Sequence, residues 1–465
     1  MSYRLRQIEL DDKMCQQVSL DVFEPIYPRQ VICEQLSQHQ AWEERERSLN
    51  MLVLIYVLLA AALWTRLSFP RVLERLARPL HVLGLPLAIM RVADSAISYR
   101  RQQLGSAPLA GLFASCCRPM CTPQTPGAYR FGRRLVAIDG SRQDVADTPA
   151  NAAAFHRPSN QYGPGPFPQI RLLLLSECGS HASFGACVQS SQQAEVTMAY
   201  ELLPLVQPDM LLLHDAQFTG LQFWQAIRAR RAHVLGPLPA HHLSRYLRQL
   251  SDGSYLAVYV PSAQQQREGL KPLLVRIIEY RISDERLGEP GRLYRLATTL
   301  LNPRTAPALE LIDCYHERWE VEIELDEIKT HQRLQQPVLR SLTPQGVVQE
   351  VYALLLAHYA VRALMVQAAQ QAQLDPDRLS FSEAVFQVSE TTRELAQVRP
   401  TQHEALRQQL LERLLAHLLP PRRLRSNPRV LKKLYRKYKR KPHDAPPVPP
   451  FDPDDHFLDF VILLI

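Results

Sequence analysis

Four residues in the second half of the chain have the types and the spacing needed for chemistry on a nucleic-acid backbone. In order, they are Tyr315, Arg318, Glu322 and Lys329. Because each α-helical residue turns by about 100°, this spacing predicts one helix, at residues 308–330, with all four side chains on one face. The carboxylate could hold a metal ion there, and the two cations could bind phosphates.

The same pattern also occurs on solvated helices, where acidic and basic residues form simple i,i+4 pairs. The spacing does not single out Glu322 either, because Asp326 lies one turn further along nearly the same face. Other glutamates crowd the segment: Glu317, Glu320, Glu324 and Glu327. The choice of a metal ligand therefore depends on other parts of the chain.

Two aspartates upstream follow short apolar runs that are typical of buried strands. Residues 134–138 lead to Asp139, and residues 210–214 lead to Asp215. A carboxylate just past the end of a buried strand lies at the rim of the sheet, where open α/β sheets bind ligands. Strand-end aspartates serve more commonly as turn or helix-cap residues.

Asp139, Asp215 and Glu322 together would offer three hard oxygen ligands, a set that suits Mg²⁺. Two such ions, about 4 Å apart, can activate a water or a 3′ hydroxyl and stabilise the leaving oxygen in a displacement at phosphorus. The pattern therefore indicates metal-dependent phosphoryl transfer.

Taken together, these segments resemble the DDE transposases of the insertion-sequence-four family. The matching residues are the AIDGS run at 137–141, the DTPAN run at 147–151, the apolar strand that ends in Asp215, and the Tyr315, Arg318, Glu322, Lys329 signature, which has no gap. The resemblance extends over residues 20–370. It implies an RNase H-like catalytic core in which Asp139, Asp215 and Glu322 are the catalytic ligands of two Mg²⁺ ions, which Mn²⁺ could replace.

The resemblance further implies cut-and-paste transposition, with cleavage at the transposon ends and transfer of the freed 3′ hydroxyl into target DNA. Tyr315, Arg318 and Lys329 would contact the DNA phosphates at the cleaved end. The partners would be double-stranded DNA, at the transposon ends and at the target, and a second copy of the chain in a homodimer on DNA. We expect a bacterial, cytoplasmic location, on the nucleoid when the protein is bound to DNA.

The chain departs from the family pattern after the second aspartate. Arg-Gly-Phe commonly follows there, whereas Ala216, Gln217 and Phe218 follow Asp215. The change removes a phosphate contact and the glycine of the local turn, so the alternative is a transposase-derived DNA-binding protein with weak or no activity. The tryptophan that stacks on a flipped base in some relatives is absent from residues 232–300, where Tyr255, Tyr259 or Tyr280 could replace it.

The charge of the chain favours a polyanionic partner. Its 465 residues carry a formal net charge of +8, with a pI near 9.1. Residues 422–441 contain eleven Lys or Arg, a run that could neutralise phosphates or could be a basic tail without a specific target. The DNA contacts expected from this run are Arg422, Arg423, Arg425, Lys432, Lys433, Arg436 and Lys437.

The order of the expected strands and helices predicts an α/β protein. Its RNase H-like core is interrupted by a β-rich insertion. Strands are expected at 135–138, 170–175, 186–189, 210–214, 254–260, 273–281 and 293–301, and helices at 193–205, 218–232 and 344–370. The expected domains are an N-terminal helical domain for DNA ends at 1–128, the first part of the core at 129–235, the insertion at 236–305, the helical second part at 306–395, and a basic C-terminal region at 396–465.

Three further expectations concern the remaining segments. Residues 106–131, rich in Pro, Cys and Gly, are expected to be a linker whose cysteines are free thiols rather than zinc ligands. The apolar run at 51–64 is too short to span a membrane and is expected to be a buried helix, so no membrane partner is predicted. The apolar end at 457–465 is expected to dock on its own core.

Overall fold

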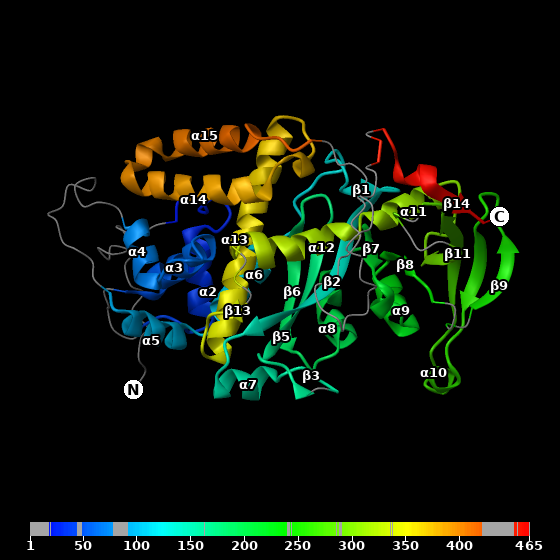
Figure 1. Ribbon diagram of the computed structural model, residues 1–465, viewed down its shortest axis with the longest axis horizontal. Coiled ribbons are helices and arrows are strands. Elements are labelled where there is room, and N and C mark those ends of the chain that lie inside the picture. The colour runs from blue at the N-terminus through cyan, green and yellow to red at the C-terminus, as the bar shows by residue number, and fades with distance from the viewer. Residues whose placement is uncertain are drawn as a thin grey trace, which may run out of the picture. The chain divides into compact units, whose positions relative to one another are not determined.

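The computed structural model describes residues 18, 20–43, 49–77, 92–161, 163–239, 242, 244–284, 286–287, 291–334, 336, 338–420, 451–452 and 454–464. The chain divides into two compact units. The first unit is Met1–Leu205 with Trp319–Leu419, and the second unit is Val206–Arg318 with Pro420–Ile465. Both units combine helices with a sheet, which confirms a mixed α/β protein (Figure 1).

The sheet of the first unit is built on three long antiparallel strands. β2 (Arg133–Val145) pairs with β5 (Gln169–Glu177), and β5 pairs with β6 (Ala182–Ser190). The short strands β1 (Tyr129–Arg130) and β13 (Val338–Leu339) also pair with β2, the second of them in parallel. Leu172 to Leu175 of β5 are all buried, so this strand is covered on both faces. A separate ribbon joins β3 (Ser159–Asn160) to β4 (Gly163–Pro164).

The helical part of the first unit packs around two apolar helices. Every residue of α3 (Met51–Leu63) is buried, and α3 packs against α13 (Pro344–Gln371). The prediction of a buried helix at 51–64 is therefore confirmed. Among the described residues, α13 alone has the length and hydropathy to cross a membrane, and 83% of its most apolar window is buried inside the protein. The other helices are α2 (Arg29–Gln38), α4 (Phe69–Leu76), α5 (Asp94–Leu104), α7 (Pro149–Phe155), α8 (Glu195–Leu202), α12 (Trp319–Asp326), α14 (Phe381–Gln397) and α15 (His403–Leu415).

The predicted linker at 106–131 is wrong for its first half, because α6 (Ala107–Cys116) occupies it. Leu109, Leu112 and Phe113 have helical spacing and are buried, and α6 packs against α2 and α13. Pro108 stands in the first turn, where a missing N–H costs nothing. The composition suggested a loop, but tertiary burial of one apolar face makes the segment a helix.

The paired strands of the second unit follow the order β7, β8, β12, β11, β10, β9. β7 and β8 are parallel, and the remaining neighbours are antiparallel. The strands are β7 (Met210–His214), β8 (His233–Pro237), β9 (Ser244–Gln249), β10 (Tyr255–Tyr259), β11 (Leu273–Ile282) and β12 (Tyr294–Thr298). The helices of this unit are α9 (Leu221–Ala229), α10 (Ala263–Arg267) and α11 (Ala308–His316).

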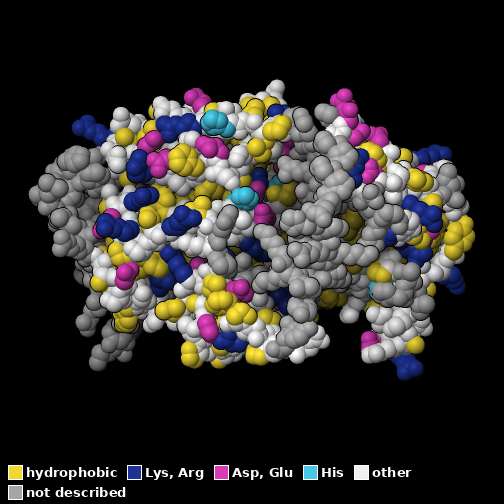
Figure 2. Space-filling model, in the orientation of Figure 1, with side chains coloured by type: hydrophobic (Ala, Val, Ile, Leu, Met, Phe, Trp, Pro, Cys, Tyr) yellow, Lys and Arg dark blue, Asp and Glu magenta, His cyan; other side chains and the backbone are white. Residues whose placement is uncertain are grey.

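β9 ends this order of strands, and its exposed side chains are both charged and apolar. Arg245 and Arg248 are exposed beside Tyr246 and Leu247, and Figure 2 shows dark-blue and yellow side chains together at this edge. The Tyr246 ring packs on the ring of Tyr255 in β10, with centroids 5.5 Å apart. Charged side chains on an edge strand hinder pairing with another chain, because they would have to lose their hydration.

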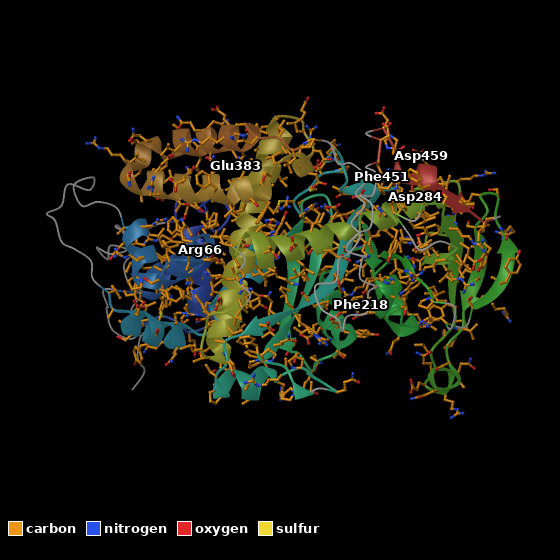
Figure 3. The ribbon with its side chains drawn as sticks, viewed as in Figure 1. Arg66, Phe218, Asp284, Glu383, Phe451 and Asp459 are labelled. Carbon is orange, nitrogen blue, oxygen red and sulfur yellow. The ribbon has the colours of Figure 1, made fainter. Side chains whose placement is uncertain are left out.

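The C-terminal end docks on the second unit, as predicted. β14 (Val461–Leu463) pairs antiparallel with β11, and the Phe457 ring stacks on His316 at the end of α11, with centroids 4.0 Å apart. Nearby, the guanidinium carbon of Arg286 lies 3.5 Å from the centre of the Phe451 ring, beside Asp284 (Figure 3). The segment is thus part of the fold of this unit.

Removing the ring of Phe457 tests this docking. Phe457 is 7% exposed, so Phe457→Ala is expected to destabilise the protein by about 3 kcal/mol through lost burial and the cavity left behind. Ile462, in the same segment, is 51% exposed, and Ile462→Ala should change stability by less than about 0.5 kcal/mol. Denaturant unfolding of the unchanged protein and of the two variants measures this difference. If Phe457→Ala unfolds at the same denaturant concentration as the unchanged protein, the docked segment does not contribute to the stability of the fold.

Candidate functional site

The Tyr315–Lys329 signature does not lie on one helix, so the prediction of a single helix at 308–330 is wrong. α11 ends at His316, α12 begins at Trp319, and a π-helix, η4 (Glu327–His331), follows Asp326. The N–H groups of Glu317 and Arg318 bond to carbonyls three residues back, which closes a turn between α11 and α12. In η4 the Gln332 N–H donates to the Glu327 carbonyl, five residues back, at 2.8 Å.

Because of this break, the four signature residues do not share one face of a straight helix. Tyr315 and Arg318 belong to the second unit, whereas Glu322 and Lys329 belong to the first. The constant turn of about 100° per residue holds only within an unbroken α-helix. The tight turn after α11 and the wider turn of the π-helix both change this rotation per residue.

In the second unit, Tyr315 and Arg318 lie near the end of β7. Arg318 is 8% exposed, and its guanidinium carbon is 5.9 Å from the centre of the Tyr315 ring. Burial, together with the charge of Arg318, lowers the pKa of His214 to about 4, so this imidazole is neutral. His214 Nδ1 lies 2.8 Å from the carbonyl oxygen of Asp215, and the neutral ring can donate this bond.

Asp215 follows β7 directly, as predicted, and its carboxylate caps a short turn. Oδ1 accepts a hydrogen bond from the Gln217 N–H at 2.8 Å, at the start of the 3₁₀ turn η3 (Ala216–Phe218). None of these turn residues has a positive φ, so the turn does not require the glycine that the family commonly has there. The side chain of Asp215 remains partly exposed.

Asp139 lies in the middle of β2, and the prediction that it follows the end of a strand is wrong. It pairs opposite Leu174, and β2 continues to Val145. The polar residues after Asp139 stay in the strand because β5, which is apolar, hydrogen-bonds along their whole length. Oδ1 of Asp139 accepts a bond from the Gly140 N–H at 2.7 Å, and a Cβ at Gly140 would come within 2.9 Å of the Glu195 carboxyl carbon.

Lys329 is the signature residue that the first unit brings to Asp139. Burial lowers the pKa of Lys329, and the nearby carboxylates of Asp139 and Asp326 oppose this change. α12 packs against β2, so the partly buried Glu322 and the strand that carries Asp139 belong to adjacent elements. The first unit therefore places Asp139, Lys329 and α12 together.

The acidic residues of the signature segment form two groups, one buried and one accessible to solvent. Glu320, Glu324 and Glu327 are 5%, 0% and 5% exposed. Glu320 and Glu324 lie one turn apart on α12, and Glu327 begins η4, whereas Glu322 and Asp326 lie on another face of α12. The Asp326 carboxylate is well exposed and accepts a bond from Thr330 Oγ1 at 2.7 Å.

Each buried glutamate has a specific partner. Glu327 Oε2 lies 3.0 Å from Arg362 Nε and 3.0 Å from His358 Nε2, both from α13. Burial opposes the charge of Glu327, but Arg362 and His358 outweigh it and lower its pKa to about 2. Burial raises the pKa of Glu324, which hydrogen-bonds Ser183 of β6. Glu320 pairs with His181. These three carboxylates therefore serve the packing of α12 and η4, a role that the sequence analysis did not assign.

A second group that the sequence analysis missed contains His181, Glu320 and Asp377, whose ligand atoms lie within 4.8 Å of one another. Arg362 Nη2 lies 2.9 Å from His181 Nδ1. Nε2 of His181 faces the carboxylates of Glu320 and Asp377, the latter at 3.0 Å. Burial and Arg362 lower the pKa of His181, but Asp377 and Glu320 outweigh them and raise it to about 10, so the charged ring pairs with the two carboxylates.

The remaining predicted DNA contacts, Arg422, Arg423, Arg425, Lys432, Lys433, Arg436 and Lys437, lie outside the described residues. The described cysteines, including Cys116, Cys117 and Cys121, are free thiols. Among the tyrosines proposed to replace the missing tryptophan, Tyr259 and Tyr280 are buried, whereas Tyr255 is partly exposed beside Tyr246.

Comparison with known proteins identifies the family of the chain. The family profile for the insertion element 4 transposase N-terminal region matches residues 17–114, and the transposase DDE domain profile matches residues 130–360. The chain belongs to the insertion-sequence-four family of DDE transposases. It is therefore a transposase, an enzyme that acts on DNA, and the DDE domain is metal-dependent.

One curated relative matches most of this transposase, and another matches a shorter part. Transposase InsG for insertion sequence element IS4 of Escherichia coli K12 is 28% identical over 397 residues, which are 85% of this chain and 88% of that protein. InsZ of the same organism is 30% identical over 139 residues, 27% of this chain and 43% of that protein. Among solved structures, the piggyBac transposase synaptic complex with hairpin DNA aligns with 12% identity and a TM-score of 0.43, covering 87% of each chain.

Neutralising Glu327 tests the role of its buried ion pair. Its folded pKa is about 2, below the ordinary 4.5, so the pair stabilises the fold above about pH 4.5 and this stability is lost as the pH falls toward 2. Glu327→Gln should cost about 3–5 kcal/mol at neutral pH, because Arg362 stays buried without its counter-charge. The variant should also lose part of the acid dependence below pH 4.5.

The matched control is Glu394→Gln, which breaks the pair of Glu394 with Arg413, whose side chains are about one-third exposed. We expect it to cost less than about 1 kcal/mol. Denaturant unfolding between pH 3 and pH 7 measures both variants. Similar losses for the two would show that burial adds nothing to the Glu327 pair.

Proposed function

We propose that this transposase cuts DNA at transposon ends and joins the freed 3′ hydroxyl to target DNA, with Asp139, Asp215 and Glu322 as the ligands of two Mg²⁺ ions. The observation that carries the assignment of Glu322 is the burial of its neighbours. Glu320, Glu324 and Glu327 are held in buried pairs, while Glu322 stands at the family's spacing from Arg318 and remains partly accessible.

The donor set fits magnesium. All three groups are partly accessible carboxylates, hard oxygen donors that leave positions for water and substrate phosphate, and Mn²⁺ accepts the same ligands. The ions, when bound, activate the attacking water or 3′ hydroxyl and stabilise the leaving oxygen.

The cations of the signature act on the DNA phosphates. Lys329 lies beside Asp139, where its ammonium serves as a point charge for a phosphate. Arg318 offers a planar fork for two parallel N–H bonds, with Tyr315 against it.

We place this chemistry on an RNase H-like core within the expected domain organisation. The order along the chain, β2, β5 and β6 followed by α8 and β7, supports this core, and β9 to β12 support a β-rich insertion at 236–305. By the same proposal, the enzyme acts as a homodimer on DNA, on the nucleoid of a bacterial cell. The alternative is a DNA-binding protein with weakened catalysis, which rests on Ala216 and Gln217 after Asp215.

Removing each proposed ligand tests the catalytic assignment. Asp139→Ala, Asp215→Ala and Glu322→Ala should each slow Mg²⁺-dependent cleavage of transposon-end DNA by at least about 100-fold. Substituting a residue that only orients a metal ligand already lowers activity by up to about 100-fold, and losing the ligand itself should cost at least as much. Binding to the same DNA should persist.

Asp326→Ala is the control, and full cleavage is expected from it. If Asp326→Ala stops cleavage and Glu322→Ala does not, Asp326 is the third ligand. Absence of cleavage by the unchanged protein would support the alternative function.

The basic run at 422–441 is a further proposed DNA-binding segment. Because β14 follows it and docks on β11, truncation would also remove a strand, so substitution is the cleaner test. Glutamine at its seven proposed DNA-binding positions, from Arg422 to Lys437, should flatten the slope of log affinity against log salt. The slope should change by about 0.9 for each phosphate that the protein no longer neutralises. Arg393→Gln, exposed on α14 and paired with Glu390, is the control. An unchanged slope in the seven-residue variant would remove the run from the interface.

A further inference from the structure

Three aromatic side chains of the second unit donate hydrogen bonds to the turn that follows β7. This turn, residues 215–219, begins with Asp215 and contains η3, whose last residue, Phe218, is labelled in Figure 3. Each donor bonds to a different backbone carbonyl of the turn: His214 Nδ1 to Asp215 at 2.8 Å, Trp224 Nε1 to Phe218 at 3.0 Å, and Tyr259 Oη to Thr219 at 2.9 Å. The backbone of the turn is thus held by side chains along its length.

The three rings come from different elements and pack against one another. His214 ends β7, Trp224 lies on α9 and Tyr259 ends β10. Trp224 contacts both of the others edge to face, with ring centroids 5.4 Å from His214 and 6.1 Å from Tyr259. His214 and Trp224 are 0% exposed, and Tyr259 is 4% exposed. Because the rings are buried against each other, their N–H and O–H groups have fixed directions.

One further side chain joins the far end of the turn to β10. His242 Nδ1 lies 2.7 Å from the Tyr259 oxygen, and its Nε2 lies 3.1 Å from Thr219 Oγ1. Tyr259 donates its one proton to the Thr219 carbonyl, so its oxygen accepts from Nδ1, and Nε2 can accept from the Thr219 hydroxyl. Two residues of the proposed insertion at 236–305 therefore hold the end of the turn that begins with Asp215.

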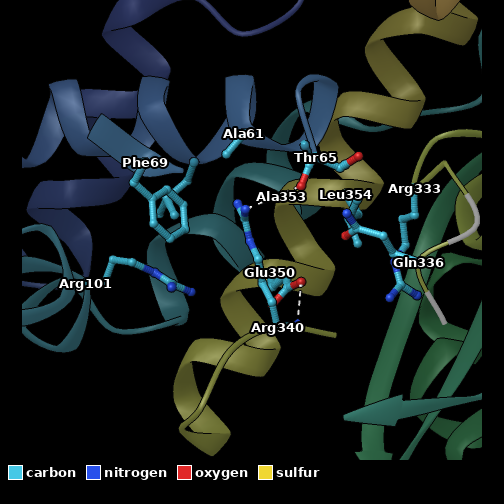
Figure 4. A pocket seen from close by; sticks show the side chains of 12 residues that line it. Ala61, Thr65, Phe69, Arg101, Arg333, Gln336, Arg340, Glu350, Ala353 and Leu354 are labelled. Atoms are coloured by element: carbon cyan, nitrogen blue, oxygen red, sulfur yellow. Dashed lines mark hydrogen bonds between the residues drawn. The ribbon is translucent and has the colours of Figure 1, made fainter. Parts of the chain in front are cut away.

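A side chain that donates to backbone carbonyls is not by itself a sign of catalysis. Arg340 lies in the wall of a small pocket of the first unit (Figure 4). It donates to the carbonyls of Thr65 and Leu67, at 3.4 and 2.8 Å. The turn after β7 differs because three rings donate within five residues, and because it presents the partly exposed carboxylate of Asp215.

We propose that His214, Trp224 and Tyr259 are positioning residues that hold the Asp215 carboxylate in the direction needed to bind a metal ion. This inference rests on the proposed function, in which Asp215 is a metal ligand, and it deepens that function. The three rings act through the backbone, since their bonds go to carbonyls of the turn. Groups that orient a metal ligand change metal affinity by about 10–100-fold when they are removed.

Tyr259→Phe is the first test, because it removes the hydroxyl and keeps the ring. Mn²⁺ is the probe, with the full-length protein bound to transposon-end DNA and the electron paramagnetic resonance signal of free Mn²⁺ as the readout. Mn²⁺ binding should weaken about tenfold, the lower end of the range for an orienting group. The Mg²⁺ concentration that gives half-maximal cleavage should rise by a similar factor.

The matched control is Tyr359→Phe in the first unit. Tyr359 is 6% exposed and donates to the Arg118 carbonyl at 2.9 Å, the same length as the bond from Tyr259 to Thr219. Each substitution removes one such bond, so the two melting temperatures should fall by similar amounts. Only Tyr259→Phe should weaken Mn²⁺ binding. Equal Mn²⁺ binding by the two variants would show that Tyr259 only stabilises the fold and would overturn its positioning role.

A pair of substitutions at His214 separates its hydrogen bond from its packing. His214→Leu and His214→Asn introduce side chains of similar size, and both remove the ring, but asparagine keeps an N–H near the position of Nδ1. His214→Asn should therefore bind Mn²⁺ several-fold more tightly than His214→Leu. This comparison keeps the proposal testable if Tyr259→Phe does not fold, and equal Mn²⁺ binding by the His214 pair would contradict it.

Asp215→Ala distinguishes this inference from the proposed function. If Asp215→Ala does not weaken Mn²⁺ binding, Asp215 is not a ligand, and the proposed ligand set and the positioning role both fail. If Asp215→Ala weakens Mn²⁺ binding but Tyr259→Phe and His214→Leu do not, the ligand set stands and the positioning role alone is overturned. Weaker binding in all three variants supports both.

Discussion

The burial of three carboxylates on α12 and η4 is the constraint on which the signature segment depends. Glu320, Glu324 and Glu327 lose almost all of their water, and a buried charge is tolerated only where partners replace that hydration. The partners come from other elements, Arg362 and His358 from α13 and Ser183 from β6. Since these pairs have directions as well as distances, α12 cannot rotate freely. The orientation of Glu322, on the other side of the helix, follows from them.

The N-terminal helices take part in this constraint. Gln332, directly after η4, is buried and donates to the carbonyls of Ala62 at the end of α3 and Leu354 of α13, at 3.3 and 3.1 Å. The end of the π turn is therefore bonded both to the helical region that matches the family's N-terminal profile and to the region that matches its DDE domain. Within the first unit, these two profile regions share one hydrophobic core.

The sequence by itself determined the family and the elements that rest on local apolar runs. β5, β7, α3 and α13 have long stretches of buried leucine, valine or alanine, and their patterns alone predicted them. The types and spacing of Tyr315, Arg318, Glu322 and Lys329 likewise indicated the family, because such spacing is a property of the chain and not of its folding. Tertiary structure decided the rest. It extended β2 beyond Asp139 through pairing with β5, made α6 a helix through burial, and interrupted the signature with a turn and a π-helix. Tertiary structure also determined which glutamates are buried. The charges that stabilise these glutamates come from residues far away in the chain, such as His181 and Arg362. Interactions between distant residues leave no periodicity in the sequence, and for that reason only the folded protein could show them.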